Sequence, residues 1–172
     1  MSRLFFALWP GDRVRDQIEQ GCSQFSRNDG RIVNKQNWHI TVVFLGNVPK
    51  DKTGELVTAA AQIKAGSFDL TIDHSGWWRT PKVVWLAPSE TPAALLDLFM
   101  QLNDLVRVNH LTTESRPYKP HLTLLRKVRK SPDLPEFTPI HWNIREFCLV
   151  ESVTLSAGVH YQVIEKWPLS TQ

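Results

Sequence analysis

Two short stretches of the chain place histidine and threonine at the same spacing. The first is HITVVFLG, residues 39–46, and the second is HLTLLRKV, residues 121–128. Each begins with His, aliphatic, Thr, aliphatic, aliphatic. With six His and 12 Thr among 172 residues, chance predicts roughly 0.4 His-x-Thr matches. Two are present, with aliphatic residues at the same places, so the repetition indicates a shared task.

Both stretches have the composition of β-strands, in which successive side chains point to opposite faces. His39 and Thr41 are therefore predicted to share one face, as are His121 and Thr123. The aliphatic residues between them point the other way, into a core. If the two strands lie side by side, their polar faces form a pocket with two imidazoles and two hydroxyls. The plainer alternative, ordinary polar positions of half-exposed strands, suits a single motif better than a matched pair.

This set of side chains suits acid–base chemistry on a phosphate. An imidazole titrates near neutrality, so one histidine can accept a proton while another donates one. Hydroxyl groups donate hydrogen bonds to phosphoryl oxygens. The sequence contains no G-x-S-x-G, HExxH or GxxxxGK[ST] motif, and neither cysteine has a local nucleophile motif. Because threonine is a poor metal ligand, we expect no metal and no cofactor, and the pattern favours metal-independent opening of a phosphodiester.

The rest of the chain shows strand and helix patterns that would position the two motifs. Apolar runs and period-two alternation predict strands over 3–9, 37–46, 68–78, 82–88, 121–128, 141–153 and 159–169, with Gly46 closing the second. Apolar residues three or four apart predict helices over 11–25, 49–66 and 89–110, with Asp12 as the first cap and Gly66 as the second stop. Residues 112–120 and the proline-rich 129–140 are predicted loops. The motif histidines lie 82 residues apart in a chain whose half-length is 86, which suggests two similar halves.

Composition indicates a globular protein of one domain, residues 1–172, with 42% hydrophobic and 22% charged residues. The formal net charge of +3 suits a phosphate-bearing partner without requiring one. Cys22 and Cys148 have no metal-like spacing and are predicted to be buried thiols. The apolar run over 4–9 is too short for a secretory or membrane segment. We therefore expect a cytoplasmic monomer that does not associate with membranes.

The two motifs resemble those of the 2H phosphoesterase superfamily, which is named for its paired His-x-Thr sequences. Within it, the chain is similar to the bacterial RNA 2′,3′-cyclic phosphodiesterases, historically called 2′-5′ RNA ligases. Besides HITV and HLTL, the likeness rests on RLFFAL, VVWL, KPHLTLLR and YQVIEKWPL, which span nearly the whole chain. The resemblance implies a bilobal α+β fold: two pseudo-symmetric, intertwined lobes with antiparallel sheets flanked by helices, and an active-site cleft between them.

The resemblance also implies an activity, the hydrolysis of a terminal 2′,3′-cyclic phosphate to a 2′-phosphate, on RNA ends or cyclic nucleotides. By motif position, His39 is the proton donor to the departing 3′ oxygen and His121 is the proton acceptor that activates water. Thr41 and Thr123 hold the phosphate oxygens. The pseudo-symmetry leaves acid and base undistinguished in the sequence, so this assignment rests on the resemblance alone.

Two further candidates, Phe44 and Arg126, each stand five residues after a motif histidine. Strict alternation turns both away from the pocket, as a core phenylalanine and a surface arginine. The resemblance implies instead that Arg126 binds the phosphate or a base, as a guanidinium can, and that Phe44 packs on a nucleoside. Weaker candidates for RNA contacts are the basic run over 126–130 and the aromatic residues Trp77, Trp78 and Tyr118. The other four histidines are expected at the surface or in packing.

Three other functions remain open at this stage. The same site run in reverse would be a 2′-5′ RNA ligase acting on tRNA half ends, which requires a second RNA end in the cleft. A non-catalytic RNA-end binder would use the basic residues alone and would keep its affinity without the histidines. A related activity on a small cyclic nucleotide or an ADP-ribose cyclic phosphate is the last alternative.

Overall fold

The computed structural model describes residues 1–112, 114–156 and 158–171. Within them the chain forms three α-helices, two 3₁₀ helices and ten strands. In chain order these are β1 (Ser2–Leu8), α1 (Asp12–Gly21), η1 (Ser23–Arg27), β2 (Arg31–Ile32), η2 (Lys35–Asn37), β3 (Ile40–Val48), α2 (Lys50–Ala60), β4 (Phe68–Ile72), β5 (His74–Trp78), β6 (Val83–Ala87), α3 (Ala93–Val108), β7 (Leu122–Arg126), β8 (Ile140–Ile144), β9 (Glu146–Leu155) and β10 (Gly158–Pro168). An α+β fold built on antiparallel sheets is confirmed.

The strands form one large antiparallel sheet and a separate two-stranded ribbon. The sheet runs β10-β9-β1-β3-β7-β6-β5, with β2 also paired to β7, and the ribbon is β4 with β8. We call β10, β9, β1 and β3 the first half-sheet, and β7, β6, β5 and β2 the second half-sheet. Within the described residues a single pair, Ile40 with Leu122, joins β3 to β7. Each half-sheet therefore carries one His-x-Thr motif at the junction.

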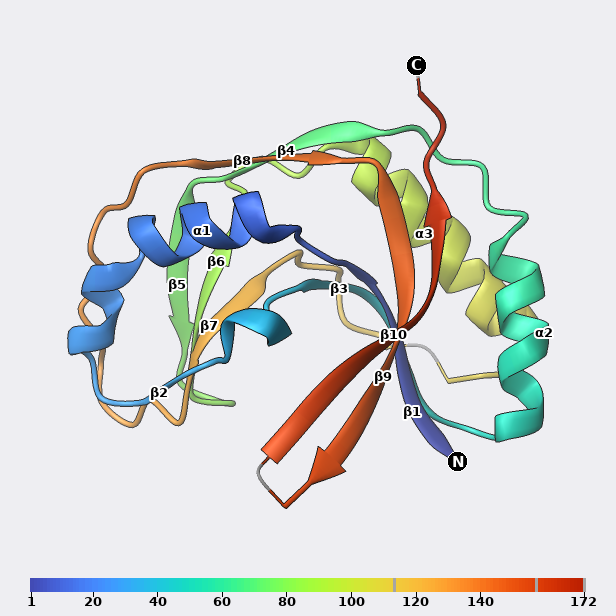
Figure 1. The fold of residues 1–172 in the computed structure, drawn as a ribbon, viewed down its shortest axis with the longest axis horizontal. Coiled ribbons are helices and arrows are strands. Elements are labelled where there is room, and N and C mark those ends of the chain that lie inside the picture. The colour runs from blue at the N-terminus through green and yellow to red at the C-terminus, as the bar shows by residue number, and fades with distance from the viewer. Residues whose placement is uncertain (113, 157, 172) are drawn as a thin grey trace.

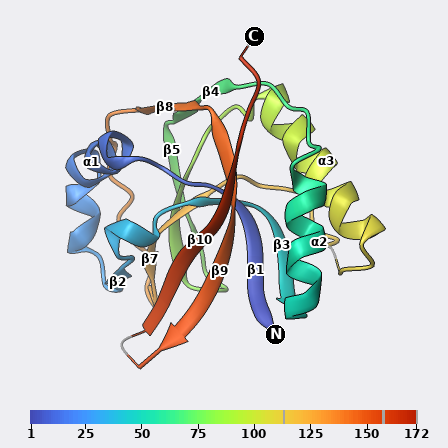
Figure 2. The same ribbon diagram turned by 45° about the vertical axis from the view of Figure 1, so that its right-hand side comes forward.

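The helices cross over between the half-sheets. Helix α1 follows β1 of the first half-sheet, but it contacts β8 of the ribbon and lines a cavity together with Leu124 and Leu125 of β7 in the second half-sheet (Figures 1 and 2). Helix α3 follows β6 of the second half-sheet but contacts β3 of the first, with α2 packed against it. Each of these helices therefore contacts strands outside the half-sheet that it follows in the chain.

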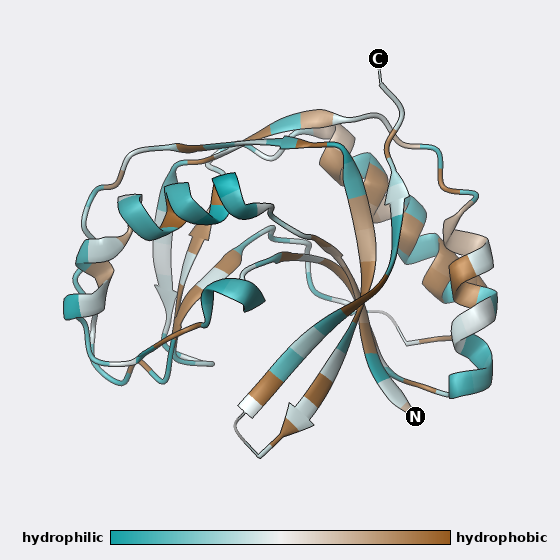
Figure 3. Cartoon of the chain, viewed as in Figure 1, coloured by the Kyte–Doolittle hydropathy of each residue, from teal (hydrophilic) through white to brown (hydrophobic). Residues whose placement is uncertain are grey.

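The two faces of the sheet differ in what covers them. On the helix side lies the main core, to which β1 contributes Leu4, Phe6 and Leu8, all fully buried. The opposite face has a smaller apolar group of Phe5, Ala7, Cys148 and Val150. Figure 3 shows the strands as hydrophobic where β1, β9 and β10 cross, and mixed toward the projecting end of the β9–β10 hairpin. We call this second face the site face, because the motif threonines share it.

Two predicted strands are each split between the sheet and the ribbon. The strand predicted over 68–78 is β4 and β5, separated by Asp73, whose carboxylate accepts hydrogen bonds of 2.8 Å from the backbone N–H and hydroxyl of Ser89. The strand predicted over 141–153 is likewise β8 and β9, separated by Arg145. In both stretches a polar residue, His74 or Glu146, takes the next place in the apolar phase after the break. A single polar residue does not by itself end a strand, so periodicity alone does not predict the two breaks. The ribbon extends over the top of the molecule in Figure 1.

Several predicted element ends are wrong by a few residues. Gly11, and not Asp12, is the N-cap of α1, and Asp12 lies in the first turn, where its charge favours the helix dipole. Helix α2 ends at Ala60, well before Gly66. Gly46 lies inside β3, which continues to Val48. Helices α1 and α3 are shorter than the predicted 11–25 and 89–110, and β2 and the 3₁₀ helices are missed. The loop predicted over 112–120 includes position 113, which lies outside the described residues.

Cys22 and Cys148 are buried free thiols, as predicted. Burial raises the pKa of each thiol to about 12, which leaves both unreactive at neutral pH. In the part of the chain that the structure describes, no helix is both long and apolar enough to cross a membrane.

Candidate active site

The four motif residues meet where the half-sheets join. Ile40 and Leu122 are paired in antiparallel register and both are fully buried, on the core face. Continuing that register by one residue on either side sets His39 against Thr123 and Thr41 against His121. A local two-fold axis therefore relates the two motifs. Both histidines lie one residue before their strands, and all four polar residues are partly exposed, on the site face.

The two imidazoles are held in the same way. Nδ1 of His39 lies 2.6 Å from the carbonyl oxygen of Asn37, and Nδ1 of His121 lies 2.8 Å from that of Lys119. A carbonyl oxygen only accepts, so Nδ1 carries the proton in each ring. In the neutral form Nε2 is then unprotonated and can act as a base, and in the cation Nε2–H can donate. One backbone hydrogen bond therefore suits either role.

A β-bulge turns Phe44 toward the site face. In the pairing of β1 with β3, Ala7 faces Thr41 and Phe5 faces Phe44. A step of two residues along β1 therefore corresponds to a step of three residues along β3. The extra residue is Val42, and consequently both Val42 and Val43 are buried. Phe44 is 44% exposed, with its ring centroid 6.0 Å from that of Phe5. Strict alternation would have hidden it in the core.

A matching bulge in β7 does the same for Arg126. Trp85 of β6 faces Thr123 and Val83 faces Arg126, so the extra residue on β7 is Leu124. Leu124 and Leu125 are both buried, and Arg126 is exposed on the face that Thr123 occupies. The two bulges occupy equivalent places after the two motifs. They are the physical reason that both residues five places after a motif histidine join the site.

Aromatic rings enclose His39. The rings of Phe5, Trp9 and Tyr161 lie 4.9, 5.4 and 5.0 Å from its imidazole by ring centroids. Trp9 is stacked on it at an interplanar angle of 15°, and Tyr161 presents its edge at 80°. These contacts leave the imidazole few orientations and remove water from most of its surface.

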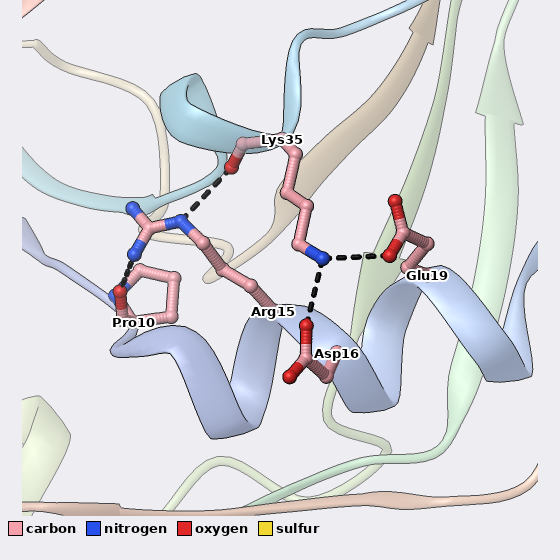
Figure 4. A network of polar contacts seen from close by, with 5 residues as sticks. All are labelled: Pro10, Arg15, Asp16, Glu19 and Lys35. Carbon is pink, nitrogen blue, oxygen red and sulfur yellow. Dashed lines mark hydrogen bonds and ion pairs between the residues drawn. The ribbon is translucent and has the colours of Figure 1, made fainter.

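A buried arginine, Arg15, packs against the Trp9 ring that is stacked on His39. The Arg15 guanidinium lies 5.6 Å from the ring centroid of Trp9 and donates hydrogen bonds to the carbonyl oxygens of Pro10 and Lys35, the latter at 2.9 Å (Figure 4). Nearby, Nζ of Lys35 forms ion pairs of 2.7 and 2.6 Å with the carboxylates of Asp16 and Glu19 of α1 (Figure 4). Helix α1 is thereby tied to η2, whose last residue provides the carbonyl that orients His39.

His121 has a more open environment on the second half-sheet. The Trp78 ring lies 4.5 Å from its imidazole, edge-on at 76°, and Trp85 lies 5.3 Å from Trp78. Gly76 makes room for Trp85, because a Cβ there would lie 2.1 Å from the indole. Trp78 thus belongs to the site, as the sequence allowed.

Burial and positive charge keep both histidines neutral in the unliganded protein. Burial lowers the pKa of His39 from 6.5 to about 4, and the charges of Arg126, His121 and Arg15 act in the same direction against the hydrogen bond to Asn37. Burial also lowers the pKa of His121, again with Arg126 adding to the effect. The charge of Arg126 thus acts on both imidazoles.

The lowered pKa of His39 predicts an acid-sensitive native state. The unfolded chain takes up this proton near pH 6.5 and the native protein only near pH 4, so acidification between these values favours unfolding. We expect the free energy of unfolding to fall by up to about 3 kcal/mol over this range on account of His39. Urea denaturation at several pH values measures it. In His39→Asn the free energy of unfolding should fall less over this pH range. If it falls equally in the variant and the wild-type protein, His39 is not the source of the acid sensitivity.

The remaining sequence candidates lie elsewhere. Trp77 packs on the main core. Tyr118 stacks on Phe99 at 4.4 Å and donates a hydrogen bond of 3.2 Å to the Thr41 carbonyl oxygen, so it fastens the preceding loop to β3. Val128 is fully buried, which interrupts the basic run over 126–130. The other four histidines are exposed, as expected: His74, His110, His141 and His160.

Two cavities lie away from the motif residues. Cavities of about 560 and 510 Å³ lie against α1, and neither is lined by a motif residue. Among residues 1–112, 114–156 and 158–171, no three His, Cys, Asp or Glu side chains are grouped as metal ligands.

Sequence reasoning missed Arg15, Trp9 and Tyr161. A signal for Arg15 is present, since it shares a helix face with Ile18 and Cys22, three and seven residues further on. An arginine inside an apolar stripe demands buried acceptors. Trp9 and Tyr161 give no such signal, because each contacts His39 from a segment that is 30 or more residues away in the chain.

Comparison with known proteins gives matches over nearly the full length. Residues 8–85 match the family model described as LigT like Phosphoesterase. The RNA 2′,3′-cyclic phosphodiesterase of Escherichia coli K12 is 32% identical over 172 residues, which cover 98% of this chain and 97% of that protein. A crystal structure of a phosphoesterase superimposes with a TM-score of 0.93 at 32% identity, covering 99% of both chains. The structure of E. coli LigT complexed with 3′-AMP gives a TM-score of 0.91 at 31% identity, covering 98% of both; other structures of that protein hold NADP⁺ or ATP.

Proposed function

The chain belongs to the family of LigT-like phosphoesterases, and from this we propose that it is an RNA 2′,3′-cyclic phosphodiesterase that opens a terminal cyclic phosphate to a 2′-phosphate. The observation that carries the proposal is the single pair Ile40–Leu122, which sets two imidazole–hydroxyl pairs around one point on the site face. The two half-sheets are then the two lobes of one domain, and the substrate phosphate lies between them.

In the proposed reaction, water attacks phosphorus opposite the 3′ oxygen. His121 Nε2 takes a proton from the water as the new P–O bond forms. The P–O3′ bond breaks, and His39 Nε2–H gives its proton to the departing 3′ oxygen. The electron pair of the broken bond stays on that oxygen, and the product is a 2′-phosphate with a free 3′ hydroxyl. Acid and base each contribute about 10²- to 10⁴-fold in such reactions.

The substrate itself provides the condition for His39 to act as an acid. In the unliganded protein the pKa of His39 is about 4 because of burial, so the ring is neutral at pH 7. A phosphate anion beside the imidazole favours the charged form and offsets the nearby positive charges. The proton is therefore taken up as the cyclic phosphate binds.

The hydroxyls of Thr41 and Thr123 and the guanidinium of Arg126 bind the non-bridging phosphate oxygens in this proposal. No metal is required, because side chains supply the acid, the base and the charge stabilisation. Phe44 and the rings beside it provide an apolar surface for the terminal nucleoside. The 3′-AMP and ATP complexes of the E. coli relative support nucleotides as ligands.

Removal of either threonine hydroxyl is expected to weaken transition-state binding. Thr41→Val and Thr123→Val should each lower kcat/KM by roughly 10- to 100-fold, the worth of a hydrogen bond to a charged group. Steady-state kinetics measures the loss, with Thr58→Val on the outside of α2 as the matched control. Wild-type kcat/KM in both motif variants would show that the hydroxyls do not bind the phosphate.

A product analysis tests the proposed function. A short RNA ending in 2′,3′-cyclic phosphate is incubated with the protein and a chelator, and the 2′- and 3′-phosphate products are separated. The expected result is hydrolysis to the 2′-phosphate alone. Absence of turnover, turnover only after metal is restored, or a joined RNA product would overturn the proposal in favour of RNA binding, metal catalysis or ligation.

A further inference from the structure

A second arginine lies directly opposite Arg126. Strand β2 lies beside β7 (Figure 1). Their pairing sets Arg31 opposite Arg126 and Ile32 opposite Leu125. Leu125 is buried on the core face, and Ile32 lines a cavity with it. Side chains that are directly opposite share a face, so Arg31 stands with Arg126 on the site face. Both are exposed.

The backbone holds the two arginines together. Gly30 has a φ of +130°, and a Cβ there would lie 2.7 Å from the Val128 side chain and 3.1 Å from the carbonyl oxygen of Arg126. Only glycine permits this close approach. On the other side of Arg31, the Val33 N–H donates a 2.9 Å hydrogen bond to the Leu124 carbonyl oxygen. The position of Arg31 is therefore fixed before any ligand binds.

The structure does not neutralise this pair. The six ion pairs within the described residues involve neither Arg31 nor Arg126. Like charges placed directly opposite on neighbouring strands destabilise a sheet. Two exposed arginines whose backbones are held side by side, with no ion pair to either guanidinium among the described residues, form a site for an anion with several acceptor oxygens, such as a phosphate.

The pair extends away from the reacting centre. Arg126 is the last residue of β7, five residues beyond His121 and three beyond Thr123, and Arg31 is paired with it at that end of the strand. The motif residues lie toward the other end of β7, where Ile40 is paired with Leu122. An anion between the two arginines lies next to the reacting phosphate and not in its place.

We propose that Arg31 binds the phosphodiester on the 5′ side of the terminal nucleoside, and that the Arg126 guanidinium, with its five N–H donors, lies between that phosphodiester and the reacting phosphate and donates to both. This inference rests on the proposed function, because it takes the cyclic phosphate to lie at the histidines. A chain of at least two nucleotides fills both places, and a mononucleoside cyclic phosphate fills only one. The protein is thereby a preferential hydrolase of oligonucleotide ends.

The test compares three substrates: adenosine 2′,3′-cyclic phosphate, the dinucleotide ending in the same cyclic phosphate, and that dinucleotide with an uncharged methylphosphonate linkage. In the wild-type protein kcat/KM for the charged dinucleotide should exceed the other two by roughly tenfold or more, the worth of charge-assisted hydrogen bonds. In Arg31→Gln that preference should disappear, and Arg31→Lys should retain part of it. The loss in kcat/KM caused by Arg31→Gln and the loss caused by the methylphosphonate should not multiply, because both changes remove the same contact.

The matched control is Arg107→Gln on α3, which removes the same charge far from the site face and should keep the preference. Equal kcat/KM losses on all three substrates in Arg31→Gln, or a full methylphosphonate penalty in that variant, would overturn the inference. Turnover of adenosine 2′,3′-cyclic phosphate by the wild-type protein separates the two proposals. If it occurs without any dinucleotide preference, this inference fails and the proposed function stands; if none of the substrates is hydrolysed, the proposed function fails.

Discussion

Replacement of His39 or His121 by alanine is expected to lower kcat for cyclic phosphate hydrolysis by about 10²- to 10⁴-fold. The reason is geometric, since each ring presents Nε2 to the site from one side of the Ile40–Leu122 pair, held by its own backbone hydrogen bond. Single-turnover rates with a cyclic-phosphate RNA measure the loss directly.

The controls for this prediction separate chemistry from folding. His141→Ala, at an exposed histidine of β8, should keep the wild-type rate. Near-UV circular dichroism should show native packing in all variants. The double variant should be far less impaired than the product of the two single losses, because acid and base act in one transition state. A rate loss below tenfold in either single variant would contradict the two-histidine mechanism.

Replacement of Arg15 by methionine is expected to cost about 3 kcal/mol of unfolding free energy and to slow turnover about tenfold. The side chain is 4% exposed and donates to the carbonyl oxygens of Pro10, Lys35 and Gln36, which would lose a buried partner. It also supports Trp9, which stacks on His39. Chemical denaturation and steady-state kinetics measure the two effects.

A positioning role for Arg15 has a signature that a purely structural role lacks. Its positive charge lowers the pKa of His39, so NMR titration of Arg15→Met should show that pKa raised. Arg15→Lys, which retains a charge and donors, should recover part of both stability and rate. The matched control is Arg13→Met, two residues earlier in the chain at an exposed position of α1. An unchanged His39 pKa together with wild-type kcat would leave Arg15 as a fold residue only.

The sequence predicts the catalytic pairs better than it predicts their surroundings. Period-two alternation correctly places His39 with Thr41, and His121 with Thr123, on one face. It fails at Phe44, because the extra residue Val42 reverses the alternation after the motif. Two adjacent aliphatic residues follow each motif threonine in the sequence, and both prove to be buried, yet such a pair alone does not distinguish a bulge from a strand buried on both faces.

The long-range pairing lies beyond sequence periodicity. Nothing local indicates that Ile40 faces Leu122, that Arg31 faces Arg126, or that the strand predicted over 68–78 divides between two sheets. These contacts depend on how distant segments of the chain pack. Resemblance to a family filled part of this gap, since it drew Phe44 and Arg126 to the site where alternation alone rejected them.

The most direct test of the account uses a cyclic phosphate in which sulfur replaces the departing 3′ oxygen. A thiolate leaves without a proton, so the substrate no longer needs the acid but still needs the base. If His39 is the acid and His121 the base, the sulfur substitution restores His39→Ala to nearly the wild-type rate and leaves His121→Ala impaired. Rescue of His121→Ala alone would exchange the two roles, and rescue of neither would contradict an acid and a base acting across one phosphorus.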